Sequence, residues 1–152
     1  PLAKKSFVNQ VHKQVEQSVK MGAKLLAGDK KPRINSCFYN PVILSDVTPG
    51  MPVFDQETFG PVIACTVVDN VDEAVKLANQ SPYGLGASIW TENILLGEKI
   101  ARKIEAGAVF VNGLVRSDPR LPFGGIKNSG FGRELSHYGI KEFCNIKSIW
   151  IR

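Results

Sequence analysis

The chain has 152 residues, of which 43% are hydrophobic and 22% charged, with a net charge of +5 at pH 7. This composition is typical of a folded globular protein and argues against a disordered chain. No apolar run approaches the roughly 20 residues that a membrane span needs. The basic residues are scattered, which disfavours nucleic-acid binding. We therefore predict neither a membrane nor a nucleic acid as a partner.

Three cysteines, Cys37, Cys65 and Cys144, are an odd number and include no C-x-x-C pair. That pattern disfavours a disulfide framework or a zinc site and is typical of the reducing cytoplasm. Residues 1–5 lack the apolar segment of a signal peptide. We expect a cytoplasmic protein without a metal site, whose thiols are buried and inert.

The first predicted element is an amphipathic helix over residues 5–26 that stops at Gly28-Asp29. Lysine, glutamine and glutamate separate four valines that recur at helical spacing: Val8, Val11, Val15 and Val19.

A basic turn at residues 30–33 and a β-prone run at 37–44, interrupted by Asn40-Pro41, come next. Residues 48–52, Thr-Pro-Gly-Met-Pro, have the composition of a loop. Residues 62–68 form a nearly continuous apolar run of strand length, which predicts a strand covered on both faces.

Two further helices are predicted after this strand. Residues 70–73, Asn-Val-Asp-Glu, have the spacing of a capping box that begins a helix over residues 71–79. Thr91 or Asn93 would cap the second helix, over residues 94–105, and Gly107 would stop it.

Short strands are predicted at residues 87–90 and 108–111, on either side of the second of these helices. Strand, helix and strand of these lengths are typical of βαβ units with right-handed crossovers, so we expect an α/β fold built on a parallel sheet. A short helix at residues 134–139 and a long terminal strand at 143–151 complete the prediction.

Residues 122–134, Pro-Phe-Gly-Gly-Ile-Lys-Asn-Ser-Gly-Phe-Gly-Arg-Glu, hold four glycines in nine positions. Such a run predicts a backbone that turns repeatedly, takes positive φ or allows another surface to approach closely. It matches neither a Walker loop nor a dinucleotide-binding fingerprint. By composition alone it is equally typical of a glycine-rich surface loop.

The same run closely resembles the C-terminal signature of the NAD(P)-dependent aldehyde dehydrogenases. Residues 57–62, Glu-Thr-Phe-Gly-Pro-Val, resemble the family's Glu-x-Phe-Gly-Pro element, and residues 82–87 and 107–112 occur in the family's order. The resemblance covers essentially the whole chain and implies roughly the last third of an enzyme. It implies part of the catalytic domain at residues 1–141.

The resemblance also implies the chemistry. The resemblance implies that the full enzyme oxidises a small aldehyde, with succinate semialdehyde as the expected substrate, to the carboxylate with NAD or NADP through a cysteine thioester. By the family's order, the nucleophile, the general base and the cofactor domain lie upstream of Pro1. We therefore expect no catalytic residue in this chain, which would be inactive alone. The alternative is a noncatalytic truncated module that associates through its terminal strand.

Glu57 and Phe59 are the candidate cofactor-binding residues. The matching glutamate of the family holds the nicotinamide ribose, and a carboxylate can accept hydrogen bonds from both ribose hydroxyls. The matching phenylalanine packs near the nicotinamide. A solvated loop acid remains the alternative for Glu57, and ordinary core packing remains the alternative for Phe59.

Ser117 is the first candidate for binding the substrate. It follows the strand that ends near Asn112, and open α/β sheets bind ligands at the carboxyl ends of parallel strands. The segment resembles succinate-semialdehyde dehydrogenases, in which a serine five residues before Pro-Phe-Gly-Gly contacts the distal carboxylate of the substrate. Ser117 occupies that position.

Arg116 and Arg120 are placed to assist Ser117, because guanidinium groups suit carboxylates. Asp118 would offset part of their charge, and surface ion pairing among these residues is an equally good explanation. Phe123 would either line the aldehyde pocket or support the loop.

Residues 142–152 are the predicted oligomerisation strand. In the family this strand joins a sheet of a neighbouring subunit, which implies a homo-oligomer, and strand addition is a physically sensible use of a free edge. The alternative is that the strand closes its own sheet.

Overall fold

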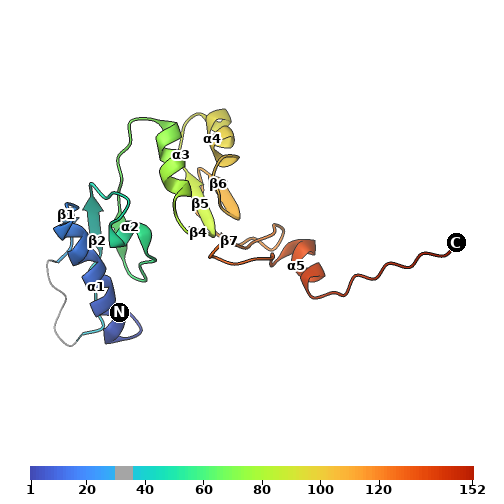
Figure 1. Cartoon of the computed structure of the whole chain (residues 1–152), viewed down its shortest axis with the longest axis horizontal. Coiled ribbons are helices and arrows are strands. Elements are labelled where there is room, and N and C mark those ends of the chain that lie inside the picture. The colour runs from blue at the N-terminus through green and yellow to red at the C-terminus, as the bar shows by residue number, and fades with distance from the viewer. Residues whose placement is uncertain (30–35) are drawn as a thin grey trace. The chain divides into compact units, whose positions relative to one another are not determined.

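The computed structural model describes residues 1–29 and 36–152 (Figure 1). These residues form two compact units, Pro1–Asn70 (unit 1) and Val71–Arg152 (unit 2), each of which is described by itself. No sequence feature predicts this division. The basic turn expected at residues 30–33 lies outside the described residues. Within the described ranges, no helix has both the length and the apolar composition to cross a membrane.

The elements, in chain order, are α1 (Lys5–Lys20), β1 (Lys24–Ala27), β2 (Val42–Ser45), α2 (Pro52–Asp55), β3 (Val62–Ala64), α3 (Val71–Asn79), β4 (Tyr83–Gly84), β5 (Gly86–Ile89), α4 (Ile94–Ala101), β6 (Ala108–Val111), β7 (Ile126–Lys127) and α5 (Ser136–Glu142).

Unit 1 places α1 beside a small mixed sheet of order β1-β2-β3, in which β1 is antiparallel and β3 parallel to β2. The core joins α1, β2 and the segment around α2: Val15, Ala23, Val42, Leu44, Val47, Met51 and Val53. Leu44, at the centre of β2, has no exposed surface. Apolar burial from three segments therefore holds unit 1 together.

The predicted helix over residues 5–26 is wrong at its C-terminal end. α1 ends at Lys20, where the N–H of Gly22 donates to the carbonyl of Val19 and the N–H of Ala23 donates to the carbonyl of Ser18. This is a Schellman cap, and Gly22 takes the positive φ of 117° that the cap requires. The next residues form β1 instead of a sixth helical turn.

Leu44→Ala should lower the free energy of unfolding of unit 1 by about 2–5 kcal/mol, because the substitution leaves a cavity at a fully buried site. Leu26→Ala is the matched control, since Leu26 lies on neighbouring β1 and is 64% exposed. We expect a change of about 0.5 kcal/mol or less for the control. Hydrogen exchange of the α1 and β2 amides measures both variants, and equal effects would contradict this core.

Unit 2 contains the predicted βαβ unit. β5 pairs in parallel with β6, and α4 connects them. The side chain of Asn93 caps α4 by accepting a hydrogen bond from the N–H of Leu96, at 3.0 Å. The helix predicted over residues 71–79 is present as α3. Here the α/β prediction is confirmed.

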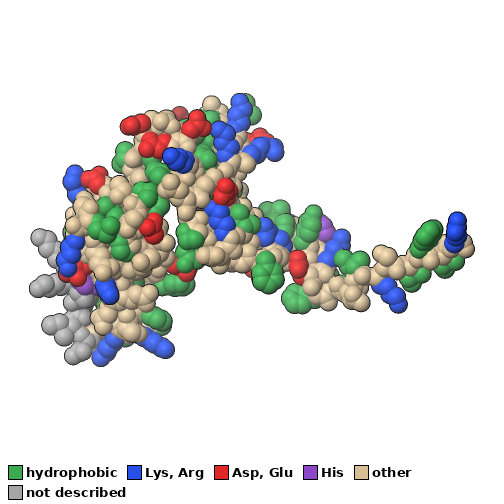
Figure 2. Space-filling model, in the orientation of Figure 1, with side chains coloured by type: hydrophobic (Ala, Val, Ile, Leu, Met, Phe, Trp, Pro, Cys, Tyr) green, Lys and Arg blue, Asp and Glu red, His purple; other side chains and the backbone are tan. Residues whose placement is uncertain are grey.

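A single parallel sheet is not confirmed. The described residues form three separate small sheets, and β4 pairs with β7 in antiparallel fashion. The strand predicted at residues 62–68 is shorter, β3, and lies at a sheet edge, where Ile63 is 58% exposed. It is not covered on both faces within the described residues. Hydrophobic side chains remain visible at many places on the face shown in Figure 2.

The terminal strand predicted at residues 143–151 does not form in this chain. After α5 the backbone continues to Arg152 without regular structure (Figure 1). A strand needs a partner for its N–H and C=O groups, and none is present among the described residues. Cys144, expected to be buried, is exposed, whereas Cys37 and Cys65 are half-buried.

Candidate functional site

Glu57 and Phe59 lie in the loop between α2 and β3 of unit 1. Both side chains are at the surface, and Phe59 is 71% exposed. Ordinary core packing therefore does not explain Phe59 within this chain. An exposed carboxylate and an exposed aromatic ring two residues apart can offer hydrogen-bond acceptors to ribose hydroxyls and an apolar face to a planar ring.

The backbone of this loop is held against α1. Nε2 of Gln14 donates to the main-chain oxygen of Glu57, at 3.2 Å. At the other end of the loop, a Cβ added to Gly60 would lie 2.9 Å from a methyl carbon of Val11. Glycine at position 60 thus lets the loop approach the helix closely.

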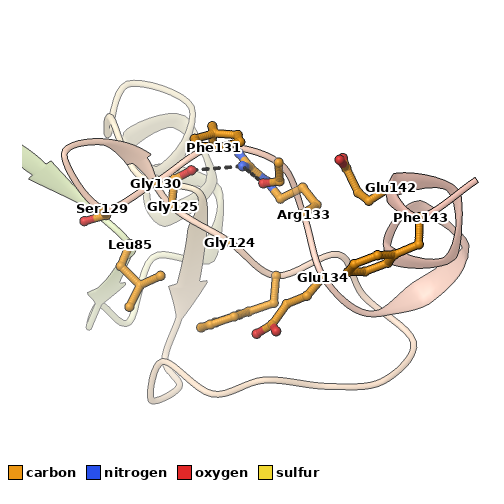
Figure 3. Close-up of a pocket in the computed structure, with 12 residues that line it drawn as sticks. Leu85, Gly124, Gly125, Ser129, Gly130, Phe131, Arg133, Glu134, Glu142 and Phe143 are labelled. Atoms are coloured by element: carbon orange, nitrogen blue, oxygen red, sulfur yellow. Dashed lines mark hydrogen bonds between the residues drawn. The ribbon is translucent and has the colours of Figure 1, made fainter.

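The glycine-rich run folds in unit 2 as a ribbon, residues 122–134, closed by two backbone hydrogen bonds. Phe123 and Glu134 exchange them, with N···O distances of 2.9 and 2.8 Å. Arg133 stabilises the ribbon from within, because its Nη1 donates to the carbonyl of Gly125, at 3.0 Å (Figure 3). The same nitrogen donates to the carbonyl of Gly132, at 2.6 Å. The ribbon is therefore an ordered element rather than a generic surface loop.

The glycines of the ribbon shape its backbone, as the sequence predicts. Gly130 and Gly132 have φ values of +134° and +72°. A Cβ on Gly124 would lie 2.8 Å from the carbonyl oxygen of Gly132, so the two arms of the ribbon approach too closely for a side chain.

Lys127 anchors the ribbon to the rest of unit 2. Its Nζ lies 2.7 Å from a carboxylate oxygen of Glu105 and donates to the carbonyls of Asn79, at 2.7 Å, and Ser81, at 3.1 Å. The Oγ of Ser129 accepts a hydrogen bond from the N–H of Gly84, at 3.0 Å. Lys127 is thus a structural residue with its ammonium group engaged.

An open hollow of about 360 Å³ lies beside the ribbon (Figure 3). Phe123 lines it together with Phe131, Arg133 and Phe143, among others. Phe131 is fully exposed in this chain, so the hollow is a surface feature of unit 2. Phe123 both lines this hollow and closes the ribbon through its backbone.

The segment 113–121 begins at a clamp that the sequence reasoning missed. The amide of Asn112 accepts from the N–H of Thr91 and donates to the carbonyl of Thr91, each at 2.8 Å. Asn112 has a φ of +53°, which turns the chain out of β6. The sequence could have indicated this turn, because Asn112 directly follows a strand and precedes a glycine, and asparagine tolerates positive φ.

Ser117, Arg116 and Arg120 are exposed on this segment. Arg120 makes a bidentate pair with Asp118, with Nε···Oδ1 at 3.0 Å and Nη2···Oδ2 at 2.7 Å. The hydrogen bonds from Arg120 hold the pKa of the Asp118 carboxyl well below its ordinary value, and the charge of Arg116 adds to the effect. Part of the predicted ion pairing therefore exists.

The Asp118–Arg120 pair distinguishes the surroundings of Arg120 from those of Arg116. The donors of Arg120 that face Asp118 are occupied, whereas Arg116 has no hydrogen-bond or ion-pair partner within the described ranges. Ser117 and Arg116 are adjacent in the chain and both reach solvent. Glu57 and Phe59 belong to unit 1 and these residues to unit 2, so the two groups are described separately.

Comparison with known proteins agrees with the motifs. The model described as "Aldehyde dehydrogenase family" matches residues 1–149. A probable succinate-semialdehyde dehydrogenase [NADP(+)] of Synechocystis sp. is 50% identical over 151 residues, which are 99% of this chain and 33% of the relative. The succinate semialdehyde dehydrogenase [NAD(P)+] Sad of Escherichia coli is 45% identical over 150 residues, with shares of 99% and 32%.

Solved structures give the same result. Succinic semialdehyde dehydrogenase from Streptococcus pyogenes, in complex with NADP+, matches with a TM-score of 0.92 and 39% identity, over 99% of this chain and 33% of that one. An aldehyde dehydrogenase from Bacillus cereus, in an NAD+ complex, matches with a TM-score of 0.90 and 38% identity, with shares of 99% and 31%. The chain spans about a third of the length of these relatives. It belongs to the aldehyde dehydrogenase family.

Proposed function

We propose that this chain is the C-terminal third of an NAD(P)-dependent aldehyde dehydrogenase that oxidises succinate semialdehyde to the carboxylate through a cysteine thioester. The observation that carries the proposal is the family match over residues 1–149, combined with relatives three times as long that are named for this substrate. The C-terminal position is supported by the order of the motifs, from residues 57–62 to the ribbon at 122–134.

In this proposal, Glu57 and Phe59 form the part of the site that faces the cofactor. The Glu57 carboxylate accepts hydrogen bonds from the hydroxyls of the nicotinamide ribose, and the exposed ring of Phe59 packs beside the nicotinamide. The exposure of both side chains on one anchored loop fits these roles. When bound, the nicotinamide supplies the hydride acceptor, and the residues of this chain orient it and exclude water.

Ser117 and Arg116 form the part that faces the substrate. A hydroxyl and a guanidinium group with no ion-pair partner in the described part of the chain can bind the distal carboxylate of succinate semialdehyde. Arg120 contributes through Asp118, by shaping the segment on which Ser117 lies. Phe123 lines the aldehyde pocket from the closed end of the ribbon.

The nucleophile is expected outside this chain, because none of its three cysteines lies in a nucleophile motif of the family. A nucleophilic thiolate needs an activating base or a positive environment. The backbone of Cys65 is paired with Leu44 and Val47 in the sheet. The thiol of Cys144, just beyond α5, donates to the carbonyl of Ile140, at 3.2 Å. The same proposal ends this part of the catalytic domain at residue 141. Residues 142–152 would join a neighbouring subunit.

The test compares two proteins in an assay of succinate semialdehyde oxidation that follows reduction of NAD and of NADP. We expect turnover by the full-length protein that contains this chain and none by the 152 residues alone. Turnover by the isolated chain would contradict the proposal, as would a full-length protein that lacks the activity. A natural product of only this length would favour the noncatalytic module, and its mass can be measured directly.

A further inference from the structure

Two polar side chains interrupt the buried face of α1. Gln14 is 5% exposed and Ser18 has no exposed surface, whereas the same face otherwise presents Val8, Val11 and Val15. A buried amide is unfavourable unless its N–H and C=O groups form hydrogen bonds. The bonds of Gln14 therefore indicate what its amide does.

Among the described residues, the Gln14 amide donates its hydrogen bonds to the loop that carries Glu57. Its Nε2 donates to Oε1 of Gln56 and to the main-chain oxygen of Glu57, each at 3.2 Å. Its Oε1 is buried and has no hydrogen-bond partner among the described residues. The side chain thus leaves one of its own groups unsatisfied while it donates to the loop.

The same helix face holds the loop on both sides of Glu57. Oγ of Ser18 accepts a hydrogen bond from the N–H of Val53 in α2, at 3.2 Å, and donates to the carbonyl of Gln14, at 2.9 Å. Val11 packs against Gly60 beyond the loop. The carbonyl of Glu57 is therefore held at the middle of a segment whose ends are also anchored to α1.

We propose that Gln14 is a positioning residue for cofactor binding: by holding the main chain of Glu57, it directs the Glu57 carboxylate toward the ribose hydroxyls of the nicotinamide half. The inference rests on the role proposed above for Glu57. With the backbone held, only side-chain rotations remain to be ordered when the ribose binds, which lowers the entropic cost of binding. Gln14 is buried and does not contact the cofactor.

The test uses Gln14→Met in the full-length protein, because methionine has nearly the same length and no donor. Gln17→Met is the matched control, since Gln17 is exposed on the same helix. We expect Gln14→Met to raise the Kd for NAD(P) about five- to tenfold, the effect of one lost hydrogen bond. The Kd for the adenosine diphosphate half of the cofactor, which lacks this ribose, should stay unchanged. The control should change neither.

A double-mutant cycle separates positioning from general destabilisation. If Gln14 acts through Glu57, Gln14→Met should have no further effect on the Kd in a Glu57→Ala protein, because coupled residues are not additive. Additive effects, an unchanged Kd in Gln14→Met, or equal weakening of NAD(P) and of its adenosine diphosphate half would overturn the proposal. Gln14→Leu serves as a second variant where Gln14→Met folds poorly.

The single variant Glu57→Ala distinguishes this inference from the proposed function. A large loss of cofactor affinity in Glu57→Ala, with no effect of Gln14→Met, overturns the positioning role alone. No loss in Glu57→Ala overturns the role of Glu57 and the positioning role together.

Discussion

Gly107→Ala should lower the free energy of unfolding of unit 2 by about 3 kcal/mol, at the upper end of the cost of overpacking. A Cβ at this position would lie 1.7 Å from the carbonyl oxygen of Gly124 and 2.8 Å from its carbonyl carbon. Both atoms are backbone, so no side-chain rotation relieves the clash. The arm of the ribbon beside β6 would have to move away, and the position of Phe123 would move with it.

Gly113→Ala is the matched control for this substitution. A Cβ on Gly113 would meet nothing closer than 3.8 Å, which is ordinary van der Waals contact. We expect a change within about 1 kcal/mol, in either direction. Urea unfolding followed by tryptophan fluorescence measures both variants, because Trp90 directly follows β5 in unit 2. Similar destabilisation by the two substitutions would show that the ribbon does not pack against Gly107 as described.

Ser117→Ala and Arg116→Ala in the full-length protein should lower kcat/KM for succinate semialdehyde about tenfold or more each, through KM. Loss of a hydrogen bond to a charged group costs about 1.5–3 kcal/mol. Both side chains are exposed, and neither is part of the Asp118–Arg120 pair. The lost contact involves the distal carboxylate of succinate semialdehyde. Butanal lacks this carboxylate, so kcat/KM for butanal should change little.

The comparison of the two aldehydes is the control for this prediction. Equal losses with succinate semialdehyde and butanal would show that the substitutions disturb the segment rather than a carboxylate contact. Asp118→Asn gives a second comparison, because it removes the bidentate acceptor of Arg120 without touching Ser117. If the pair only shapes the segment, this variant should weaken binding of both aldehydes alike.

Local sequence rules predicted the elements whose partners are near in the chain. The β5–α4–β6 unit and the Asn93 cap depend on contacts within about one supersecondary unit, and both are present. The glycine-rich ribbon was also predictable, because the positive φ values of Gly130 and Gly132 favour glycine. These elements depend on local backbone geometry.

The features that sequence reasoning missed depend on distant partners or on competing local signals. Gln14 donates to residues 42 and 43 positions away, and no periodicity reveals such a contact. The sequence could have indicated only that Gln14 is buried, because its position falls on the same helical stripe as Val11 and Val15. The end of α1 was misplaced because Lys24–Ala27 is too short to distinguish a strand from a helical turn.

The terminal segment, residues 143–151, shows a second limit of prediction from sequence. Its alternating pattern is typical of a strand, yet Ile146 and Trp150 are 80% and 86% exposed and the backbone has no strand partner within the described residues. Pattern predicts the tendency to pair, whereas pairing itself requires a second edge. A strand supplied by a neighbouring subunit would satisfy it, which remains part of the proposed function.

The roles proposed for Glu57 and for the ribbon are tested most directly by a crystal structure of the full-length protein with NAD(P) bound. We expect the Glu57 carboxylate to accept hydrogen bonds of about 2.7 Å from the nicotinamide ribose hydroxyls. We also expect the ribbon at residues 122–134 and the segment after Asn112 to border the aldehyde pocket. A Glu57 side chain that faces solvent away from the cofactor would contradict its proposed role. A ribbon remote from the aldehyde pocket would contradict the role proposed for the ribbon.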